Sequence, residues 1–243
     1  MDRDLSIDSI CRGEIVLAQP RRGYRFNVDS VILADFAGVV GRPVERAVDL
    51  GAGCGVVGLL LARRGLAQQM LLVEIQQELV EAARENIRHN GLEGRVDVVH
   101  GDLRQPGMWL ASSAQLVVSN PPFFRRGTGL VSSHPQVALA RHEVTCTLED
   151  LVQASAGALE PGGSLVMIHA EHRLDEARQA MKRHGLKPRT VRRVRPLPDR
   201  RWSRALLQGI VGGEEPEEEL PPLLIETTPG VYSPELARIL GDR

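Results

Sequence analysis

The chain has 243 residues, of which 42% are hydrophobic, 25% are charged and only 3% are aromatic. This composition is ordinary for a folded globular protein, and it excludes collagen-like, disordered and bilayer-spanning chains. No run approaches the roughly 18 consecutive apolar residues of a membrane helix, and the charged start Met1–Asp4 is unlike a secretory signal. We therefore expect a cytoplasmic protein with an N-terminal arm at residues 1–28 and one main domain at residues 29–243.

The cysteines and histidines show no ligand-like spacing. Cys11, Cys54 and Cys146 lie far apart and form no C-x-x-C pair, which argues against a disulfide framework and a zinc site. We expect reduced thiols and no metal.

The N-terminal region reads as a hairpin followed by a helix. Two extended runs, Cys11–Ala18 and Tyr24–Phe26, flank the turn-like segment Gln19–Gly23, a pattern that predicts a β-hairpin arm. The pair Asp29–Ser30 can cap a helix that continues through Ala37.

Short apolar runs then alternate with helical patterns. Such alternation predicts βαβ crossovers and a parallel sheet covered by helices on both faces. The helix before the last of these strands is signalled by Thr147 at its start and by Pro161–Gly163 at its end. The runs are Ala47–Leu50, Met70–Val73, Val96–His100, Leu116–Val118 and Ser164–Ala170, and Gln76–Asn90 is the clearest helix between them.

The C-terminal third predicts one more helix and two more strands. Leu174–His184 has helical spacing, and Thr190–Leu197 and Ala205–Val211 read as a final antiparallel pair joined by the Arg-rich bend Pro198–Arg204. The acidic segment Gly212–Leu220 is too dense in like charge to pack, so we expect a mobile surface loop.

A glycine-rich turn directly after the first parallel strand indicates a ligand site. Its glycines leave the backbone bare at the carboxyl end of a strand, where open α/β sheets bind ligands. Glu74 ends the next strand, where it can accept ribose hydroxyls, and Asp102 follows the third strand, where it can meet an adenine amine. Asp49 would repel a pyrophosphate but attract the ammonium and sulfonium of S-adenosylmethionine. The glycines are Gly51, Gly53 and Gly55.

The fourth strand ends in the sharpest signal of the chain, Asn120-Pro121-Pro122-Phe123. The two prolines fix a turn at the carboxyl end of the sheet. An exocyclic amine is a poor nucleophile because its lone pair is delocalised into the ring. The Asn120 side-chain oxygen and the Pro121 carbonyl can hold its two N–H groups so that the lone pair faces a methyl donor, and Phe123 can stack on an extruded base.

These motifs resemble the class I S-adenosylmethionine-dependent methyltransferases that modify amino groups. Other segments resemble the tRNA(Val) adenine-37 N6-methyltransferase family in particular, and the resemblance covers almost the whole chain. Many amino-methyltransferases have Tyr at the place of Phe123. Compared with Tyr, Phe123 keeps the stacking and loses a phenolic hydrogen bond. The segments are Gly23–Ala34, Ser119–Arg125, Thr147–Leu151, Pro161–Gly163, His172–Leu174 and Gly230–Glu235.

The resemblance implies a Rossmann-like α/β fold. It has a mostly parallel seven-stranded sheet with helices on both faces, an antiparallel final strand pair and the N-terminal hairpin arm. It also implies S-adenosylmethionine as cofactor and Asn120–Phe123 as the catalytic turn. The cofactor residues would be Phe26 and Asp29 at the methionine end, Glu74 with Ile75 at the ribose, and Asp102 with Leu103 at the adenine, together with Asp49, Gly51, Gly53, Gly55 and Asn120.

Basic residues point to RNA, most simply tRNA. Residues 173–204 contain twelve basic side chains and three acidic ones, and phosphate binding favours such clusters. The leading interpretation is N6-methylation of an adenine, at position 37 of tRNA(Val). The alternatives are an rRNA guanine N2-methyltransferase, a protein glutamine N5-methyltransferase and a non-catalytic RNA-binding module. The oligomeric state stays open and a monomer is compatible. The RNA-binding candidates are Arg125, Arg126, Arg192, Arg193, Arg200, Arg201 and Trp202.

Overall fold

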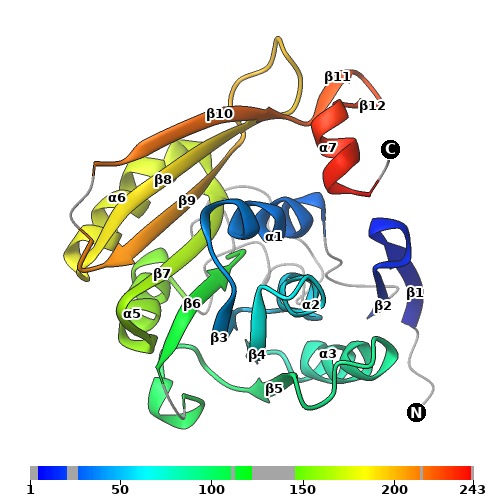
Figure 1. The fold of residues 1–243 in the computed structure, drawn as a ribbon, viewed down its shortest axis with the longest axis vertical. Coiled ribbons are helices and arrows are strands. Elements are labelled where there is room, and N and C mark those ends of the chain that lie inside the picture. Colours follow the sequence, from blue (N-terminus) through cyan, green and yellow to red (C-terminus); the bar gives the residue numbers. More distant parts are fainter. Residues whose placement is uncertain (1–4, 21–26, 111–112, 122–145, 214–215, 242–243) are drawn as a thin grey trace.

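The computed structural model describes residues 5–20, 27–110, 113–121, 146–213 and 216–241. Among these residues, the centre is an eight-stranded sheet in the order β10-β8-β9-β7-β6-β3-β4-β5 (Figure 1). The strands are β3 (Val44–Leu50), β4 (Ala67–Glu74), β5 (Val96–His100), β6 (Ala114–Ser119), β7 (Leu159–Ala170), β8 (Leu186–Arg195), β9 (Arg204–Val211) and β10 (Glu218–Leu224).

Helices cover both faces of this sheet (Figure 1). One apolar core lies under α1 to α3 and the other under α5 and α6. Short elements complete the described chain: α7 (Pro234–Ile239), the 3-10 turns η1 (Cys11–Gly13), η2 (Pro106–Met108) and η3 (Glu171–Arg173), and the pairs β1 (Leu5–Ile10) with β2 (Ile15–Pro20) and β11 (Glu226–Thr228) with β12 (Val231–Tyr232). The long helices are α1 (Val28–Val40), α2 (Val56–Arg63), α3 (Gln77–His89), α5 (Leu148–Ala158) and α6 (Leu174–Arg183).

The strand directions confirm the expected fold, but the sheet has eight strands rather than seven because β10 adds an edge beside β8. Strands β5, β4, β3, β6 and β7 run parallel, and β9 runs antiparallel to both β7 and β8. The chain winds outward from β3 in one direction and from β6 in the other. Ligands of open α/β sheets bind at the carboxyl edge of such a reversal, which here lies between β3 and β6.

The N-terminal hairpin forms, but its turn is not where the sequence pattern placed it. The chain reverses at Cys11–Gly13, which has positive φ angles of 50°, 54° and 88°, and Gln19 and Pro20 belong to β2 rather than to a turn. Residues 21–26 lie outside the described residues. The predicted position of the turn was wrong because a tertiary contact decides it, since Ile15 and Leu17 are buried in the core beside α3.

Two asparagines, Asn86 in α3 and Asn90 at the cap of its C-terminal end, hold the backbone of β2. Asn86 accepts a hydrogen bond from Ala18 N at 2.5 Å and donates to Ala18 O at 3.1 Å. Asn90 does the same with Val16, at 2.9 and 2.7 Å. Asn86 also donates to Cys54 O at 2.9 Å. The side-chain amides thus act as a neighbouring strand, and they join the hairpin to the glycine-rich turn.

Two helix ends differ from the expectation, and one cap confirms it. The cap of α1 is Asn27, whose Oδ1 accepts from Asp29 N at 3.1 Å, rather than Asp29 or Ser30. Helix α5 ends at Ala158, so Pro161–Gly163 lies within β7. At the start of α5, Thr147 and Asp150 form a capping box.

The acidic segment expected to be a mobile loop becomes the edge strand in part. Residues 218–220 begin β10, which pairs in parallel with β8. Its Pro221 and Pro222 are tolerated because an edge strand has one unpaired side. Two of the acidic side chains are neutralised by basic partners, since Glu219 pairs with Arg193 of β8 and Glu217 pairs with Arg178 of α6.

Candidate active site

The glycine-rich turn leaves β3 at Leu50 and enters α2 at Gly55. Gly51, Gly53 and Gly55 have φ angles of +73°, +59° and +91°, which a residue with a Cβ rarely adopts. Gly51 N and Ala52 N donate to the carbonyl of Val73 at 2.9 and 3.1 Å. The turn is therefore fixed to β4, and the glycines are required by backbone geometry.

Asp49 is a buried carboxyl group beneath this turn. Its Oδ2 accepts a hydrogen bond from Gly58 N, in the first turn of α2, at 3.0 Å. Burial raises the pKa of Asp49 to about 7, against the opposing effect of the Gly58 N–H and together with the nearby charge of Glu74. Near neutral pH this group is therefore poised to ionise fully when a cation binds beside it.

The raised pKa of Asp49 predicts a pH-dependent stability difference. Because the folded protein binds this proton more tightly than the unfolded chain, its stabilising contribution is complete below about pH 4 and is lost as the pH rises through about 7. Asp49→Asn, whose amide oxygen can still accept from Gly58, should unfold at a higher temperature than the parent at pH 8 and show a much smaller advantage at pH 5. Calorimetric melting at both pH values tests this, and an equal difference at the two would contradict it.

Glu74 reaches back from the end of β4 to the same turn. Its Oε2 accepts from Gly53 N at 2.8 Å and its Oε1 accepts from Gln76 N at 2.8 Å. Burial raises the pKa of Glu74, and the hydrogen bonds from Gln76 and Gly53 oppose that rise. Each oxygen keeps a second lone pair, so the carboxylate is held in one orientation and can still accept two hydroxyls.

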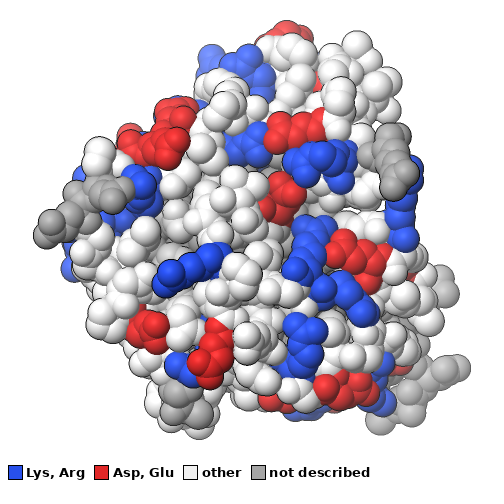
Figure 2. Space-filling view, in the orientation of Figure 1, with Lys and Arg blue, Asp and Glu red and all other residues white. Residues whose placement is uncertain are grey.

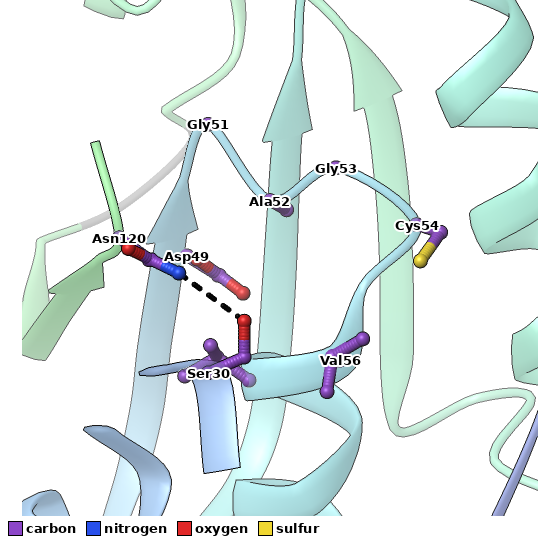
Figure 3. Close-up of a pocket in the computed structure, with 9 residues that line it drawn as sticks. Ser30, Asp49, Gly51, Ala52, Gly53, Cys54, Val56 and Asn120 are labelled. Carbon is purple, nitrogen blue, oxygen red and sulfur yellow. Dashed lines mark hydrogen bonds between the residues drawn. The ribbon is translucent and has the colours of Figure 1, made fainter. Parts of the chain in front are cut away.

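Asn120 follows β6 and lies across the pocket from the glycine-rich turn (Figure 3). Its Nδ2 donates to Ser30 Oγ, near the start of α1, at 3.2 Å. With Nδ2 directed at Ser30, Oδ1 stays available for a substrate. The pocket is lined by Ser30, Asp49, Gly51, Ala52, Gly53, Cys54, Val56, Val57 and Asn120.

The remaining predicted catalytic residues can be placed only in part. Pro121 directly follows Asn120 and is half-buried. Phe26, Pro122, Phe123, Arg125 and Arg126 lie outside the described residues.

Asp29 is buried beside the pocket, and side chains of the protein already bind its carboxylate. Its Oδ2 accepts from Arg204 Nε at 3.2 Å and from Asn27 Nδ2 at 3.0 Å. Arg204 is the last residue of the Arg-rich bend. An ion pair therefore connects that bend to the helix that carries Ser30.

The residues predicted at the adenine lie next to Glu74 along the sheet edge, outside the lining of this pocket. Gly101 N donates to Glu74 O at 3.0 Å, which places Asp102 and Leu103 beside the end of β4. The Asp102 carboxylate is paired with Arg104, which lowers its pKa. Ile75 has a side chain that is 39% exposed although it is apolar.

The structure separates the predicted RNA-binding residues into two groups. Arg192 is buried and pairs with Glu235, and Arg193 pairs with Glu171 and Glu219. Arg200 and Arg201 are exposed on the bend between β8 and β9. Figure 2 shows basic side chains gathered at the top of the view, where Figure 1 draws this connection.

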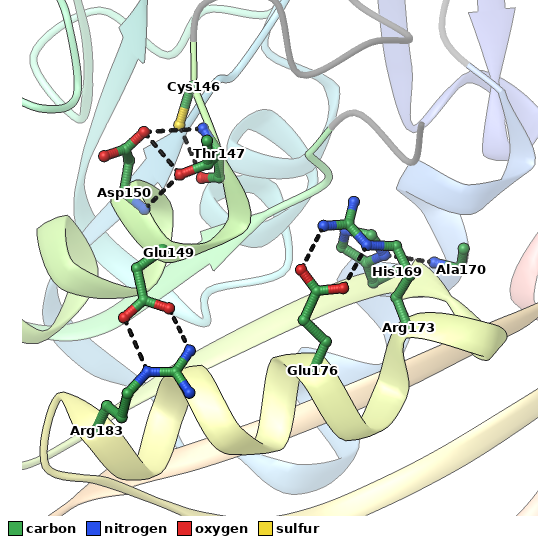
Figure 4. A network of polar contacts seen from close by, with 9 residues as sticks. All are labelled: Cys146, Thr147, Glu149, Asp150, His169, Ala170, Arg173, Glu176 and Arg183. Carbon is green, nitrogen blue, oxygen red and sulfur yellow. Dashed lines mark hydrogen bonds and ion pairs between the residues drawn. The ribbon is translucent and has the colours of Figure 1, made fainter. Parts of the chain in front are cut away.

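Most of the other basic residues in 173–204 serve the fold. Arg173 pairs with Glu176, and Arg183 of α6 pairs with Glu149 of α5 (Figure 4). Trp202 is half-buried and carries the Arg195 guanidinium at 3.8 Å from its ring centroid.

Sequence reasoning missed two residues of the site, Ser30 in its contact with Asn120 and Gln76 in its contacts with Glu74. Ser30 was noticed only as a helix cap. Its real partner is 90 residues away, so no local pattern announces it. Gln76 could have been found, because the residues that follow an acidic strand end are placed to bond its carboxylate.

Comparisons with known proteins identify the family of this chain. A family model described as "Methyltransferase small domain" matches residues 36–193. The chain belongs to this family. It is also similar to a tRNA1(Val) (adenine(37)-N6)-methyltransferase of Porphyromonas gingivalis, at 30% identity over 88% of this chain and 86% of the relative. A relative of the same name from Flavobacterium johnsoniae is 29% identical over 89% and 91%.

Solved structures agree on the methyltransferase fold. A predicted O-methyltransferase from Agrobacterium tumefaciens superposes with a TM-score of 0.68 at 23% identity, covering 88% of this chain and 98% of that one. A tRNA m1G37 methyltransferase of Methanocaldococcus jannaschii gives 0.63 at 17% identity, covering 88% and 59%. Within the described ranges, no helix has the length and hydrophobicity to cross a bilayer. The same part of the chain holds no cluster of metal-ligating side chains.

Proposed function

We propose that the protein transfers a methyl group from S-adenosylmethionine to N6 of an adenine in tRNA, at position 37 of tRNA(Val), and that it works in the cytoplasm where this RNA is used. The observation that carries the proposal is the Asn120 amide, held by Ser30 across one pocket from Asp49 and the glycine-rich turn. The names of the relatives support the choice of tRNA and of adenine.

The residues present fit the cofactor. The buried Asp49 carboxyl suits a neighbouring positive charge, and the oriented Glu74 carboxylate suits a pair of ribose hydroxyls. The exposed Ile75 side chain offers an apolar surface to a purine ring. When bound, S-adenosylmethionine supplies a methyl group on a positively charged sulfur, so the donor needs no further activation.

The protein's task is then to prepare the amine. Asn120 Oδ1 and the Pro121 carbonyl can each accept one N–H of the N6 amino group. Both hydrogen bonds strengthen as the nitrogen becomes pyramidal and its lone pair is freed, so they favour the transition state over the ground state. Phe123, three residues after Asn120, would hold the extruded base by stacking.

Mass spectrometry of nucleosides tests the function directly. Purified protein is incubated with deuterium-methyl S-adenosylmethionine and an unmodified tRNA(Val) transcript, and the digest is searched for labelled N6-methyladenosine. The matched control is the same transcript with guanine at position 37, which should stay unlabelled. Labelled N2-methylguanosine would favour the guanine alternative, and no label in any RNA would refute the proposal.

The exposed bend makes a salt-dependence prediction. If Arg200 and Arg201 hold phosphates, replacing both with alanine should lower the slope of log K against log salt for tRNA binding by about one to two units. The control is the double replacement of Arg42 and Arg88, exposed arginines at the amino edge of the sheet, which should leave the slope unchanged. Filter binding over a salt series measures both. An unchanged slope in the Arg200/Arg201 variant would remove the bend from the RNA interface.

A further inference from the structure

We propose that the β11–β12 hairpin, which exposes Val231 and Tyr232, presents the Tyr232 ring as a platform on which an unpaired RNA base stacks, next to the phosphate-binding bend. This inference rests on the proposed function, because it assigns a second contact to the same RNA. No sequence pattern in the bend points to these two residues, which come about thirty positions later.

Hydrogen bonds place the hairpin against the bend. Ile225 N donates to Arg195 O at 2.8 Å, and Glu226 N donates to Pro196 O at 2.9 Å. Within the hairpin, Glu226 of β11 lies opposite Tyr232 of β12 in the antiparallel strand pair. Figure 1 accordingly draws β11 and β12 beside the β8–β9 connection at the top of the molecule.

The hairpin also lies at the catalytic edge of the sheet. Ser203, in the bend, donates from its N–H to Val194 O at 3.0 Å and accepts from Glu171 N at 3.3 Å. Glu171 follows the carboxyl end of β7, the strand next to β6. An RNA that enters the pocket at Asn120 can therefore reach the bend and the hairpin without leaving this edge.

The hairpin is firmly built, although its two apolar side chains face solvent. Val231 is 54% exposed and Tyr232 is 49% exposed. Gly230 N donates to Glu226 Oε2 at 3.0 Å. Ser233 Oγ donates to Leu224 O at 2.5 Å and also caps α7 through Leu236 N at 3.1 Å. These contacts fix the backbone from which the two exposed side chains project.

The chemistry of the surroundings favours an RNA over an apolar protein partner. Exposed arginines supply phosphate contacts, and every base has a π-face that an aromatic ring can take. Trp202 already has the Arg195 guanidinium over its ring. Among the described residues, Tyr232 is the one aromatic residue in the set of exposed large hydrophobic side chains.

Stacking and phosphate contacts can be separated by their salt dependence. Tyr232→Ala should weaken tRNA binding about five- to hundredfold and leave the salt slope at the parent value, because no counterion is released by a stacked ring. Tyr232→Phe should bind like the parent. The KM for tRNA should rise while kcat at saturating tRNA and the affinity for S-adenosylmethionine stay unchanged.

A matched pair guards against a folding artefact. Val231→Ala, whose side chain leaves the opposite face of the strand, and Val39→Ala, at a site 58% exposed near the amino edge of the sheet, should both keep the parental affinity for tRNA. Parental tRNA affinity in Tyr232→Ala, or equal losses in Tyr232→Phe and Tyr232→Ala, would overturn the stacking platform. If the parent binds and methylates tRNA but Tyr232→Ala keeps the parental affinity for tRNA, the proposed function stands without the platform. If the parent does not bind tRNA, both fall.

Discussion

Asn120→Ala should lower turnover by a hundred- to a thousandfold while leaving the affinity for S-adenosylmethionine nearly unchanged. In the proposed mechanism the side chain accepts a hydrogen bond from the substrate amine, and losing one preorganised group of this kind typically costs about 2.7–4 kcal/mol of transition-state stabilisation. Single-turnover methylation of tRNA measures the loss, and calorimetry with S-adenosylmethionine measures the affinity. An Asn120→Ala protein that methylates RNA at close to the parent rate would refute the amine mechanism.

Ser30→Ala is the informative companion of that variant. It keeps the Asn120 acceptor but removes the hydroxyl that receives Nδ2 at 3.2 Å, so the amide loses its fixed orientation. A neutral hydrogen bond contributes about 0.5–1.5 kcal/mol, so turnover should fall about two- to tenfold, far less than in Asn120→Ala. Calorimetry that shows parental affinity for S-adenosylmethionine in both variants excludes a collapsed pocket. With that control, equal losses of turnover in the two variants would contradict the orienting role of Ser30.

The glycine-rich turn and the acids beside it were predictable from sequence because they follow directly from strand ends in the predicted sheet. Gly51, Gly53 and Gly55 need positive φ angles, and an acid at the end of a strand faces the turn beside it. The parallel direction of β3, β4, β5 and β6 follows from the alternation of apolar and helical segments. The glycine conformations depend on neighbours within a few residues, so the sequence carries them in full.

The charged C-terminal third was less predictable because its partners are far apart in sequence. Arg192 pairs with a carboxylate 43 residues away and Arg193 with one 26 residues away. Counting charge along the chain detects the excess of arginine without detecting these partners. The same limit explains the wrong prediction for β10. The charge density of the acidic segment suggested a loop because its distant partners, Arg178 and Arg193, cannot be identified from the sequence.

Glu74→Ala should weaken S-adenosylmethionine binding by about 1.5–3 kcal/mol, the range for a lost hydrogen bond to a charged group, or tenfold to roughly a hundredfold in Kd. The effect has two sources. The variant loses the acceptor that we propose for the ribose hydroxyls, and it frees the Gly53 and Gln76 N–H groups that the carboxylate now holds at 2.8 Å each.

Glu74→Gln separates charge from shape. Both carboxylate oxygens accept backbone N–H groups, so an amide must turn its NH₂ toward one of these donors, and we expect it to bind S-adenosylmethionine no better than the alanine variant. Glu93→Ala, an exposed acid beyond α3, removes the same charge far from the site and should bind like the parent. Calorimetric titration compares the four proteins. Parental affinity in Glu74→Ala would move the cofactor away from the glycine-rich turn, whereas a weak alanine variant with a fully active glutamine variant would leave the site in place and show that the hydroxyls need only a neutral acceptor.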